Sequence, residues 1–231
     1  MADPADLTMT TVRDNLAAVE ARIADAAKLA GRDPAEITLV AVSKTQSEER
    51  VRAALEAGHR VFGENRIQEA EARWGTLRPD YPDMTLHFIG HLQSNKAAEV
   101  VAHCDVIESI DRPKLARALA REMDRQSRHQ RCFIQVNTGE EPQKGGVIPS
   151  EAEALLTLCR DELRLDVMGL MCIPPADQEP APHFAMLAQM ARDFGLEALS
   201  MGMSGDFETA VRLGATHVRV GTAIFGERLT G

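Results

Sequence analysis

The sequence has few cysteines and no long apolar run, and both absences restrict what the protein can be. The four cysteines, Cys104, Cys132, Cys159 and Cys172, show no C-x-x-C spacing, which argues against a zinc site or a dithiol redox motif. Scattered single cysteines are typical of buried thiols in a reducing compartment. No apolar stretch approaches the roughly 20 residues that a membrane-spanning helix needs. We therefore expect no membrane partner.

Positive charge is also scarce. The 231 residues include 26 Lys and Arg against 35 Asp and Glu, a formal charge of −9, with no block of basic residues. Nucleic acids and anionic membranes are bound through clustered Lys and Arg, so we expect no nucleic-acid partner. The N-terminus, MADPADLTMTTVRDNL, has acids where a signal peptide has a basic region and an apolar run. A cytoplasmic protein is the expectation.

What the sequence does have is a regular alternation of strand and helix patterns. A helix is expected first, over residues 6–30, where apolar residues recur at helical spacing and Gly31 provides a stop. Eight strands, each followed by a helix, come after it. The expected strands cover residues 37–44, 60–65, 85–92, 105–111, 131–139, 163–171, 198–205 and 216–226. Helical crossovers return the chain to the same end of the sheet, so the strands are parallel.

Eight such units in a chain of this length fit a closed (β/α)8 barrel. The alternative is an open, doubly wound sheet, but no G-x-G-x-x-G follows the first strand, so that fold lacks its phosphate-binding motif. No low-complexity linker divides the chain. We predict one α/β domain over residues 1–231, a TIM-type barrel with an extra N-terminal helix.

Lys44 ends the first expected strand, in the stretch ITLVAVSKTQ. Active sites of such barrels lie at the C-terminal ends of the strands. Side chains alternate along a strand, and the more uniformly apolar face, with Leu39 and Ala41, suits packing against helices, which turns Lys44 inward. A partly desolvated amine there would be a better nucleophile toward a carbonyl carbon. The alternative is a solvated strand end with the ammonium group in water.

Small residues follow the seventh and eighth strands, where barrels of this kind often hold a phosphate. GMSGDFETA contains Ser204, and RVGTAIFG contains Gly221 and Thr222. Glycine allows close backbone approach, so the two turns could form a phosphate cradle. Alternatively, Gly-Ser turns begin many helices without any ligand, and Ser204 or Asp206 could simply cap the helix that follows.

Arg219 shares a face of the eighth strand with His217, opposite two valines, and should therefore point into the barrel. A buried arginine needs a partner. That partner is either a bound ligand or a carboxylate inside the barrel, such as Asp166 or Glu108.

Asn65 ends the second strand, where it could reach a ligand or act as a helix N-cap. His87 and His91 are four residues apart, a metal-ligand spacing on a helix. Gly90 interrupts that segment, however, and no nearby carboxylate or cysteine completes a set of ligands. We expect no metal site.

A strand-end lysine, a phosphate cradle and an inward arginine on one barrel together suggest pyridoxal 5′-phosphate. The aldehyde of this cofactor forms a Schiff base with a lysine, and its phosphate would take the cradle.

Seven segments of the sequence, taken in order, resemble those of the pyridoxal phosphate homeostasis proteins. They run from about Val40 to Gly226 and are LVAVSKT, FGEN, HFIGHLQSNK, QVNTGEEPQKGGV, GLMCIPP, SMGMSGDFETAV and HVRVGTAIFG. The resemblance implies a single barrel like the N-terminal barrel domain of alanine racemase, carrying one pyridoxal phosphate. The site residues that it implies are Lys44 for the Schiff base, Ser204, Gly221 and Thr222 at the phosphate, and Asn65 and Arg219 beside the cofactor.

The resemblance implies intracellular storage and delivery of the cofactor, with pyridoxal phosphate-dependent apoenzymes as partners and no established catalytic turnover, so no catalytic residue is assigned. The related racemases use a tyrosine from a further β-domain as second acid/base. We expect no such domain here, and the one tyrosine, Tyr81, precedes the third strand at the wrong end of the barrel. If Arg219 faces the pyridine nitrogen, its charge disfavours protonation there and weakens the electron sink.

Two other functions stay open at this point. One is a fold-type III enzyme with weak amino-acid racemase or lyase activity. The other is a barrel that binds another phosphorylated aldehyde through a Schiff base. The expected helices show no extra apolar stripe, and we expect a monomer.

Overall fold

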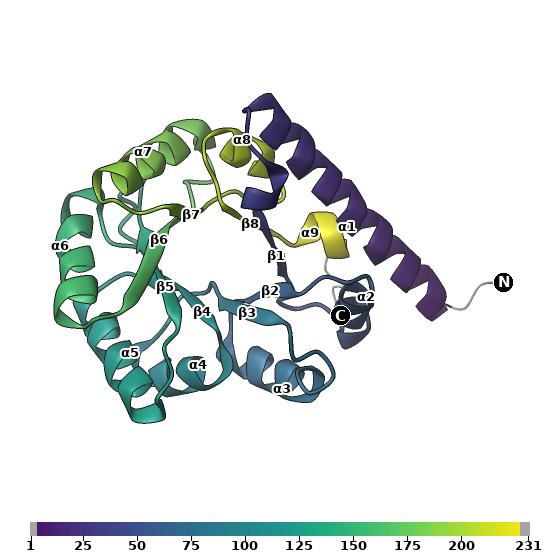
Figure 1. Cartoon of the computed structure of the whole chain (residues 1–231), viewed down its shortest axis with the longest axis horizontal. Helices are drawn as coiled ribbons and strands as arrows, with labels where there is room; N and C mark the ends of the chain where they lie inside the picture. Colours follow the sequence, from purple (N-terminus) through teal and green to yellow (C-terminus); the bar gives the residue numbers. More distant parts are fainter. Residues whose placement is uncertain (1–3, 227–231) are drawn as a thin grey trace.

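Eight parallel strands close into a barrel (Figure 1). In this computed structural model residues 4–226 are described, with side chains from residue 8 onward. The strands are β1 (Thr38–Val42), β2 (Val61–Glu64), β3 (Thr85–Phe88), β4 (Val106–Ile110), β5 (Arg131–Val136), β6 (Asp166–Cys172), β7 (Ala198–Ser200) and β8 (His217–Val220). They pair in chain order, and β8 pairs back onto β1, with Thr38 opposite His217 and Ala41 opposite Val220.

Helices form a ring outside the strands (Figure 1). The α-helices are α1 (Pro4–Leu29), α2 (Glu48–Glu56), α3 (Ile67–Leu77), α4 (Ala97–His103), α5 (Pro113–Gln126), α6 (Ala152–Thr157), α7 (Pro180–Asp193), α8 (Phe207–Arg212) and α9 (Thr222–Phe225). The short helical segments are η1 (Pro34–Glu36), η2 (Ser94–Lys96), η3 (Pro149–Glu151) and the π-helical η4 (Leu158–Glu162). Pro113 and Pro180 begin α5 and α7, where a missing N–H costs nothing.

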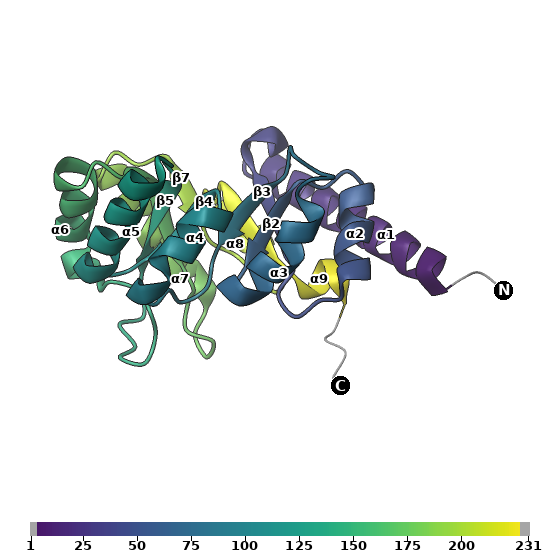
Figure 2. The ribbon, with the colours of Figure 1, turned by 90° about the horizontal axis from the view of Figure 1, so that it is seen from below.

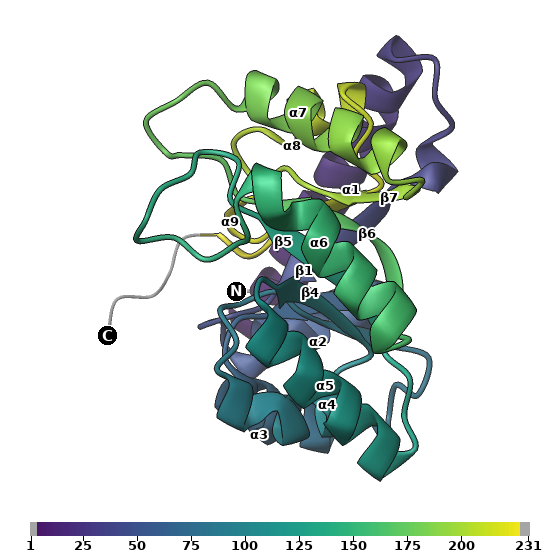
Figure 3. The same cartoon turned by 90° about the vertical axis from the view of Figure 1, so that its left-hand side faces the viewer.

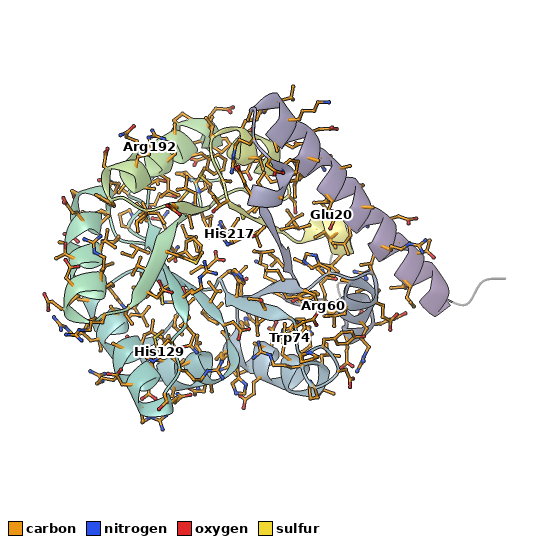
Figure 4. The ribbon with its side chains drawn as sticks, viewed as in Figure 1. Glu20, Arg60, Trp74, His129, Arg192 and His217 are labelled. Atoms are coloured by element: carbon orange, nitrogen blue, oxygen red, sulfur yellow. The ribbon has the colours of Figure 1, made fainter. Side chains whose placement is uncertain are left out.

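The alternation of side chains along the strands separates two layers. Leu39 and Ala41 of β1 belong to the large apolar core between the strands and the helices. In the same outer layer, Phe62 of β2 packs on Trp74 of α3, with ring centroids 4.8 Å apart (Figure 4). Gly63 follows the outward-facing Phe62 in β2, so a Cβ on Gly63 would point into the barrel. That Cβ would lie 2.9 Å from Cγ1 of Val40, which therefore faces inward as well.

The barrel interior is packed and is not a channel. A small apolar cluster fills it toward the amino ends of the strands; its buried members are Val106, Phe133, Met171 and Ala198. Polar side chains also point into the interior. Among them His217, the first residue of β8, lies against Phe133 of this cluster with ring centroids 5.2 Å apart, and Figure 4 labels it inside the ring of strands.

Helix α1 packs against helices α2, α8 and α9 on the outside of the barrel. Its buried face recurs every three or four residues, as expected for a helix packed along one side; the buried residues are Val12, Leu16, Val19, Ile23, Ala26 and Ala27. These contact α2, α8 and α9. Asn15 Nδ2 donates to the carbonyl oxygen of Ile224 at 2.9 Å, and Arg22 pairs with Glu208 at 2.8 Å. The extra helix therefore anchors the segments that follow β7 and β8.

The predicted barrel, its extra N-terminal helix and its eight strands are confirmed. All strands except β6 end earlier than expected at their carboxyl ends: β1 stops at Val42 and β8 at Val220, because the next residues turn away from the ladder. Strand β6 ends one residue later than expected, at Cys172. Residues 1–3 and 227–231 of the expected domain lie outside the described part. The four cysteines are buried free thiols. Among the described residues, no helix is long and apolar enough to cross a bilayer.

Two glycines give a matched test of packing in the barrel. A Cβ on Gly169 of β6 would lie 2.0 Å from the carbonyl oxygen of Ala198, whereas a Cβ on Gly75 of α3 meets nothing within 4 Å. We expect Gly169→Ala to lower the free energy of unfolding by about 2–3 kcal/mol through overpacking. Gly75→Ala should raise it by about 0.5–1 kcal/mol through helix propensity. Urea denaturation measures both; equal midpoints for the two variants would contradict the packing described.

Candidate functional site

A cavity of about 290 Å³ opens at the carboxyl ends of the strands. The loops that follow β5 and β6 project from the same side of the barrel as α9 (Figures 2 and 3). The residues that line the cavity are Val42, Lys44, Asn65, Ile89, Ile173, Met203, Ser204, Gly205, Arg219, Gly221 and Thr222. All six residues predicted as site residues therefore line one cavity.

Lys44 lies in a tight turn just beyond β1. The N–H of Gln46 donates to the carbonyl oxygen of Ser43 at 3.1 Å and closes the turn. Thr45, the third residue of the turn, has φ of 60°, a left-handed conformation that is unusual for a β-branched residue. Strain of this kind concentrates at functional sites. The turn places Lys44 at the mouth of the barrel, half-buried, between β1 and the cavity.

Asn65 follows β2 directly and lies beside Lys44 in the cavity wall. Its Oδ1 is buried and has no hydrogen-bond partner among the described residues. The N-cap position of α3 belongs to Arg66 and has no side-chain cap, so the alternative role of Asn65 as an N-cap is wrong. A buried amide oxygen without a partner is costly unless a ligand or water satisfies it.

The turns after β7 and β8 meet through Ser204. Its Oγ accepts from the N–H of Gly221 at 3.3 Å and from the N–H of Ala223 at 3.5 Å. Ser204 therefore caps the start of α9, after the eighth strand, and not the helix after the seventh. Asp206 accepts from the N–H of Met203 at 2.6 Å and makes no side-chain cap to α8. Ser204, Gly221 and Thr222 thus form one corner of the cavity.

Arg219 is buried at the floor of the cavity, where its guanidinium is held by protein groups. Nη1 donates to Ser200 Oγ at 2.6 Å, and Nη2 donates to the carbonyl oxygen of Cys172 at 2.8 Å. Glu108 Oε2 lies 4.0 Å from Nη1. Asp166 begins β6 at the other end of the barrel and is exposed. The carboxylate partner of Arg219 is Glu108, and the guanidinium also borders the cavity.

Glu108 connects several inward side chains. His87 Nδ1 lies 2.6 Å from its Oε1, and Ser200 Oγ donates to its Oε2 at 2.5 Å. Burial alone would raise the pKa of Glu108, but the hydrogen bond and charge of His87, the charge of Arg219 and the Ser200 hydroxyl lower it to about 2. Glu108 is therefore an anion that compensates the charge of Arg219 inside the barrel.

Three other hollows among the described residues are larger but lack this combination. One of about 460 Å³ lies beside α1 at the amino ends of β1 and β2, one of about 640 Å³ lies around Arg112 and Lys144, and one of about 570 Å³ lies between α5 and the start of β6. None of the three contains a lysine beside a strand end together with small-residue turns. In the described part of the chain, no group of three or more His, Cys, Asp or Glu could hold a metal ion.

Sequence reasoning missed several members of the site. Ile89 and Ile173 line the cavity after β3 and β6, and Ser200 holds Arg219 from β7. Ile173 and Met203 are partly exposed, at 36% and 39%. Ile89 and Ile173 directly follow β3 and β6, and this position is the signal that could have found them, since the carboxyl ends of all eight strands meet at this face.

The closed barrel and the position of its cavity define the class of protein. The family model described as alanine racemase, N-terminal domain, matches residues 15–229. An alanine racemase from Corynebacterium glutamicum has a TM-score of 0.67 at 23% identity, covering 96% of this chain and 63% of that one. The chain is thus a barrel domain of the alanine racemase N-terminal type.

Closer relatives identify the family within this class. A Pseudomonas aeruginosa protein named pyridoxal phosphate homeostasis protein is 43% identical, covering 95% of this chain and 97% of that protein. An Escherichia coli protein of the same name is 38% identical, with 95% and 98% covered. The structure of PipY from Synechococcus elongatus with PLP bound has a TM-score of 0.79 at 36% identity, covering 93% of this chain and 100% of that one. The chain belongs to the pyridoxal phosphate homeostasis protein family.

Acid should weaken the fold through His217. Burial lowers the pKa of His217 to about 4, so between about pH 6.5 and 4 the unfolded chain binds a proton that the folded chain does not. Stability contributed by the neutral imidazole is therefore lost as the pH falls through this window, by up to about 3 kcal/mol. His217→Asn should flatten the loss in urea denaturation, whereas the exposed His91→Asn should keep the wild-type slope. Equal slopes for both variants would refute this assignment.

Proposed function

We propose that this protein binds pyridoxal 5′-phosphate in the cavity and holds it as a Schiff base on Lys44, for storage and delivery of the cofactor. The observation that carries the proposal is that the strand-end lysine and the Ser204 corner line one cavity at the face where such barrels bind ligands. The names of the relatives and the PLP-bound structure of PipY support it. The free thiols favour the cytoplasm as the compartment.

The residues of the cavity fit this cofactor. When bound, it supplies an aldehyde that condenses with an amine. Lys44 provides the amine. The corner of Ser204, Gly221 and Thr222 has the small residues that let a phosphate approach the backbone. The buried Oδ1 of Asn65, which has no partner in the described part of the chain, can accept a hydrogen bond from a ring substituent.

Arg219 favours a carrier over a catalyst. Its guanidinium uses two of its five N–H groups in the hydrogen bonds to Ser200 and Cys172, and it borders the cavity with others. If the ring nitrogen of the bound cofactor faces this guanidinium, the fixed positive charge would disfavour protonation of that nitrogen. Tyr81 lies before β3, at the amino end of the barrel and away from the cavity residues. We therefore assign no acid/base pair for racemisation. Delivery of the cofactor to apoenzymes and the monomeric state of the protein stay predictions.

Lys44→Ala should abolish covalent attachment of the cofactor. We expect the wild-type protein with added pyridoxal phosphate to show a visible absorption band, and borohydride to fix the label on the peptide containing Lys44. Lys44→Ala should lose both signals, while Lys96→Ala, whose lysine pairs with Glu99 on the surface at 2.9 Å, should retain them. Label on Lys96 or on another lysine in the wild type would sink the assignment. A colourless wild-type protein would sink the binding proposal itself.

Incubation with amino acids separates a carrier from an enzyme. We expect the loaded protein to release or transfer cofactor, with no turnover of L- and D-amino acids above that of free pyridoxal phosphate. Chiral chromatography measures racemisation, and detection of keto acids measures lyase activity. Sustained turnover that disappears in Lys44→Ala would replace the carrier by the alternative, a weak fold-type III enzyme.

A further inference from the structure

The side chain of Arg73 crosses from α3 to the turn that carries Lys44. Its Nη1 donates to the carbonyl oxygen of Ser43 at 3.0 Å, and its Nη2 donates to the carbonyl oxygen of Gln46 at 2.7 Å. Ser43 and Gln46 are the first and last residues of the turn. One guanidinium therefore spans the whole turn. Arg73 itself lies outside the set of described residues that line the cavity.

A buried carboxylate holds Arg73 in this orientation. Glu64, the last residue of β2, is fully buried and pairs with Arg73 Nη1 through Oε1 at 2.5 Å. The same oxygen accepts from Ser43 Oγ at 2.8 Å and from Trp74 Nε1 at 3.3 Å. Burying an ion pair of this kind brings little net stability, because desolvation offsets the attraction. Stability therefore does not explain why this ion pair lies beside the turn.

The backbone of the turn supplies that reason. Thr45 has φ of 60°, a left-handed conformation that is unfavourable for a β-branched residue. Helix α3 also contributes Glu69, whose Oε2 accepts from the N–H of Thr45 at 3.4 Å. The turn is strained, and two side chains from α3 hold it in place.

We infer that Arg73 is a positioning residue for Lys44: by binding the carbonyl oxygens at both ends of the turn, it fixes where the amine enters the cavity. The inference rests on the proposed function of Lys44. In the step concerned, the neutral amine of Lys44 bonds to the aldehyde carbon, and its two hydrogens leave with the aldehyde oxygen as one water. Glu64 acts on Lys44 only indirectly, because it orients the guanidinium of Arg73.

Arg73→Met tests the inference, with Arg78→Met as the matched control. Arg78 is the C-cap residue of the same helix and pairs with Asp105, which precedes β4 at the amino end of the barrel, so its loss removes an arginine–carboxylate pair, more exposed than that of Arg73, away from the turn. For Arg73→Met we expect the rate of covalent attachment of pyridoxal phosphate to fall about tenfold, the scale of one misplaced or lost hydrogen bond to a charged group. Arg78→Met should attach at the wild-type rate.

Two further readouts do not depend on attachment. Pyridoxine 5′-phosphate, which has an alcohol in place of the aldehyde, should bind Arg73→Met within about twofold of its wild-type affinity, because the cavity itself is unchanged. Hydrogen exchange of the Gln46 amide should accelerate in Arg73→Met and not in Arg78→Met. Arg73→Lys, which keeps the charge but not the two-pronged geometry, should fall between wild type and Arg73→Met in attachment rate.

A folded Arg73→Met protein that attaches the cofactor at the wild-type rate overturns the inference, and so does unchanged exchange at Gln46. If Arg73→Met does not fold, Glu64→Gln takes its place and should slow attachment while preserving affinity for the alcohol analogue; a wild-type rate in that variant overturns the inference. Failure of the proposed function is distinguishable, because either the wild-type protein would stay colourless or Lys44→Ala would keep the visible band, whatever happens at Arg73.

Discussion

The pairing of β8 with β1 is the interaction on which the site depends. It joins the two ends of the chain, with Ala41 opposite Val220 in the last rung of the ladder. The residues that follow these two strands then lie at one corner of the barrel mouth. Lys44 and the Gly221 turn become neighbours for this reason alone, and α1 reinforces the closure by binding α8 and α9. Any change that opens this seam removes the cavity together with the fold.

Beneath the cavity, the charges of Arg219 and Glu108 are held in fixed positions by contacts within the protein. Arg219 is oriented by Ser200 and by a backbone carbonyl, and Glu108 supplies the balancing negative charge within the barrel. The guanidinium consequently cannot turn to follow a ligand, and its field is fixed. A second ion pair, Arg73 with Glu64, lies between β2 and α3, outside the barrel interior. The Arg219–Glu108 pair determines the electrostatic potential at the floor of the cavity, and the Arg73–Glu64 pair holds the backbone turn that carries Lys44.

The sequence predicted the topology, and it predicted six candidate site residues that line one cavity, because strand period and strand-end position govern both. Strand alternation placed Lys44 and Arg219 on the inner face, and the strand-end rule collected the small-residue turns. Contacts between side chains on different elements carry no such periodic signal, so the ion pair of Arg73 with Glu64 could not be predicted from the sequence. Strand β4 shows a further limit: its register with β5 shifts between Ile107 and Ile110, and both residues belong to the outer core although strict alternation would place them on opposite faces. The alternative in which Ser204 caps the helix after β7 was wrong, because its hydroxyl accepts from N–H groups at the start of α9, a contact between turns far apart in the sequence.

The burial of the four cysteines has a chemical consequence for a protein that handles an aldehyde. Thiolates add to aldehydes readily, but burial raises the pKa of Cys104, Cys159 and Cys172 to about 12 and raises that of Cys132 as well. Amines compete too, yet only five of the 26 basic residues are lysines, and the guanidinium groups of the others form no imines under ordinary conditions. The composition of the chain thus leaves Lys44 only four other lysine side chains as competitors for an aldehyde.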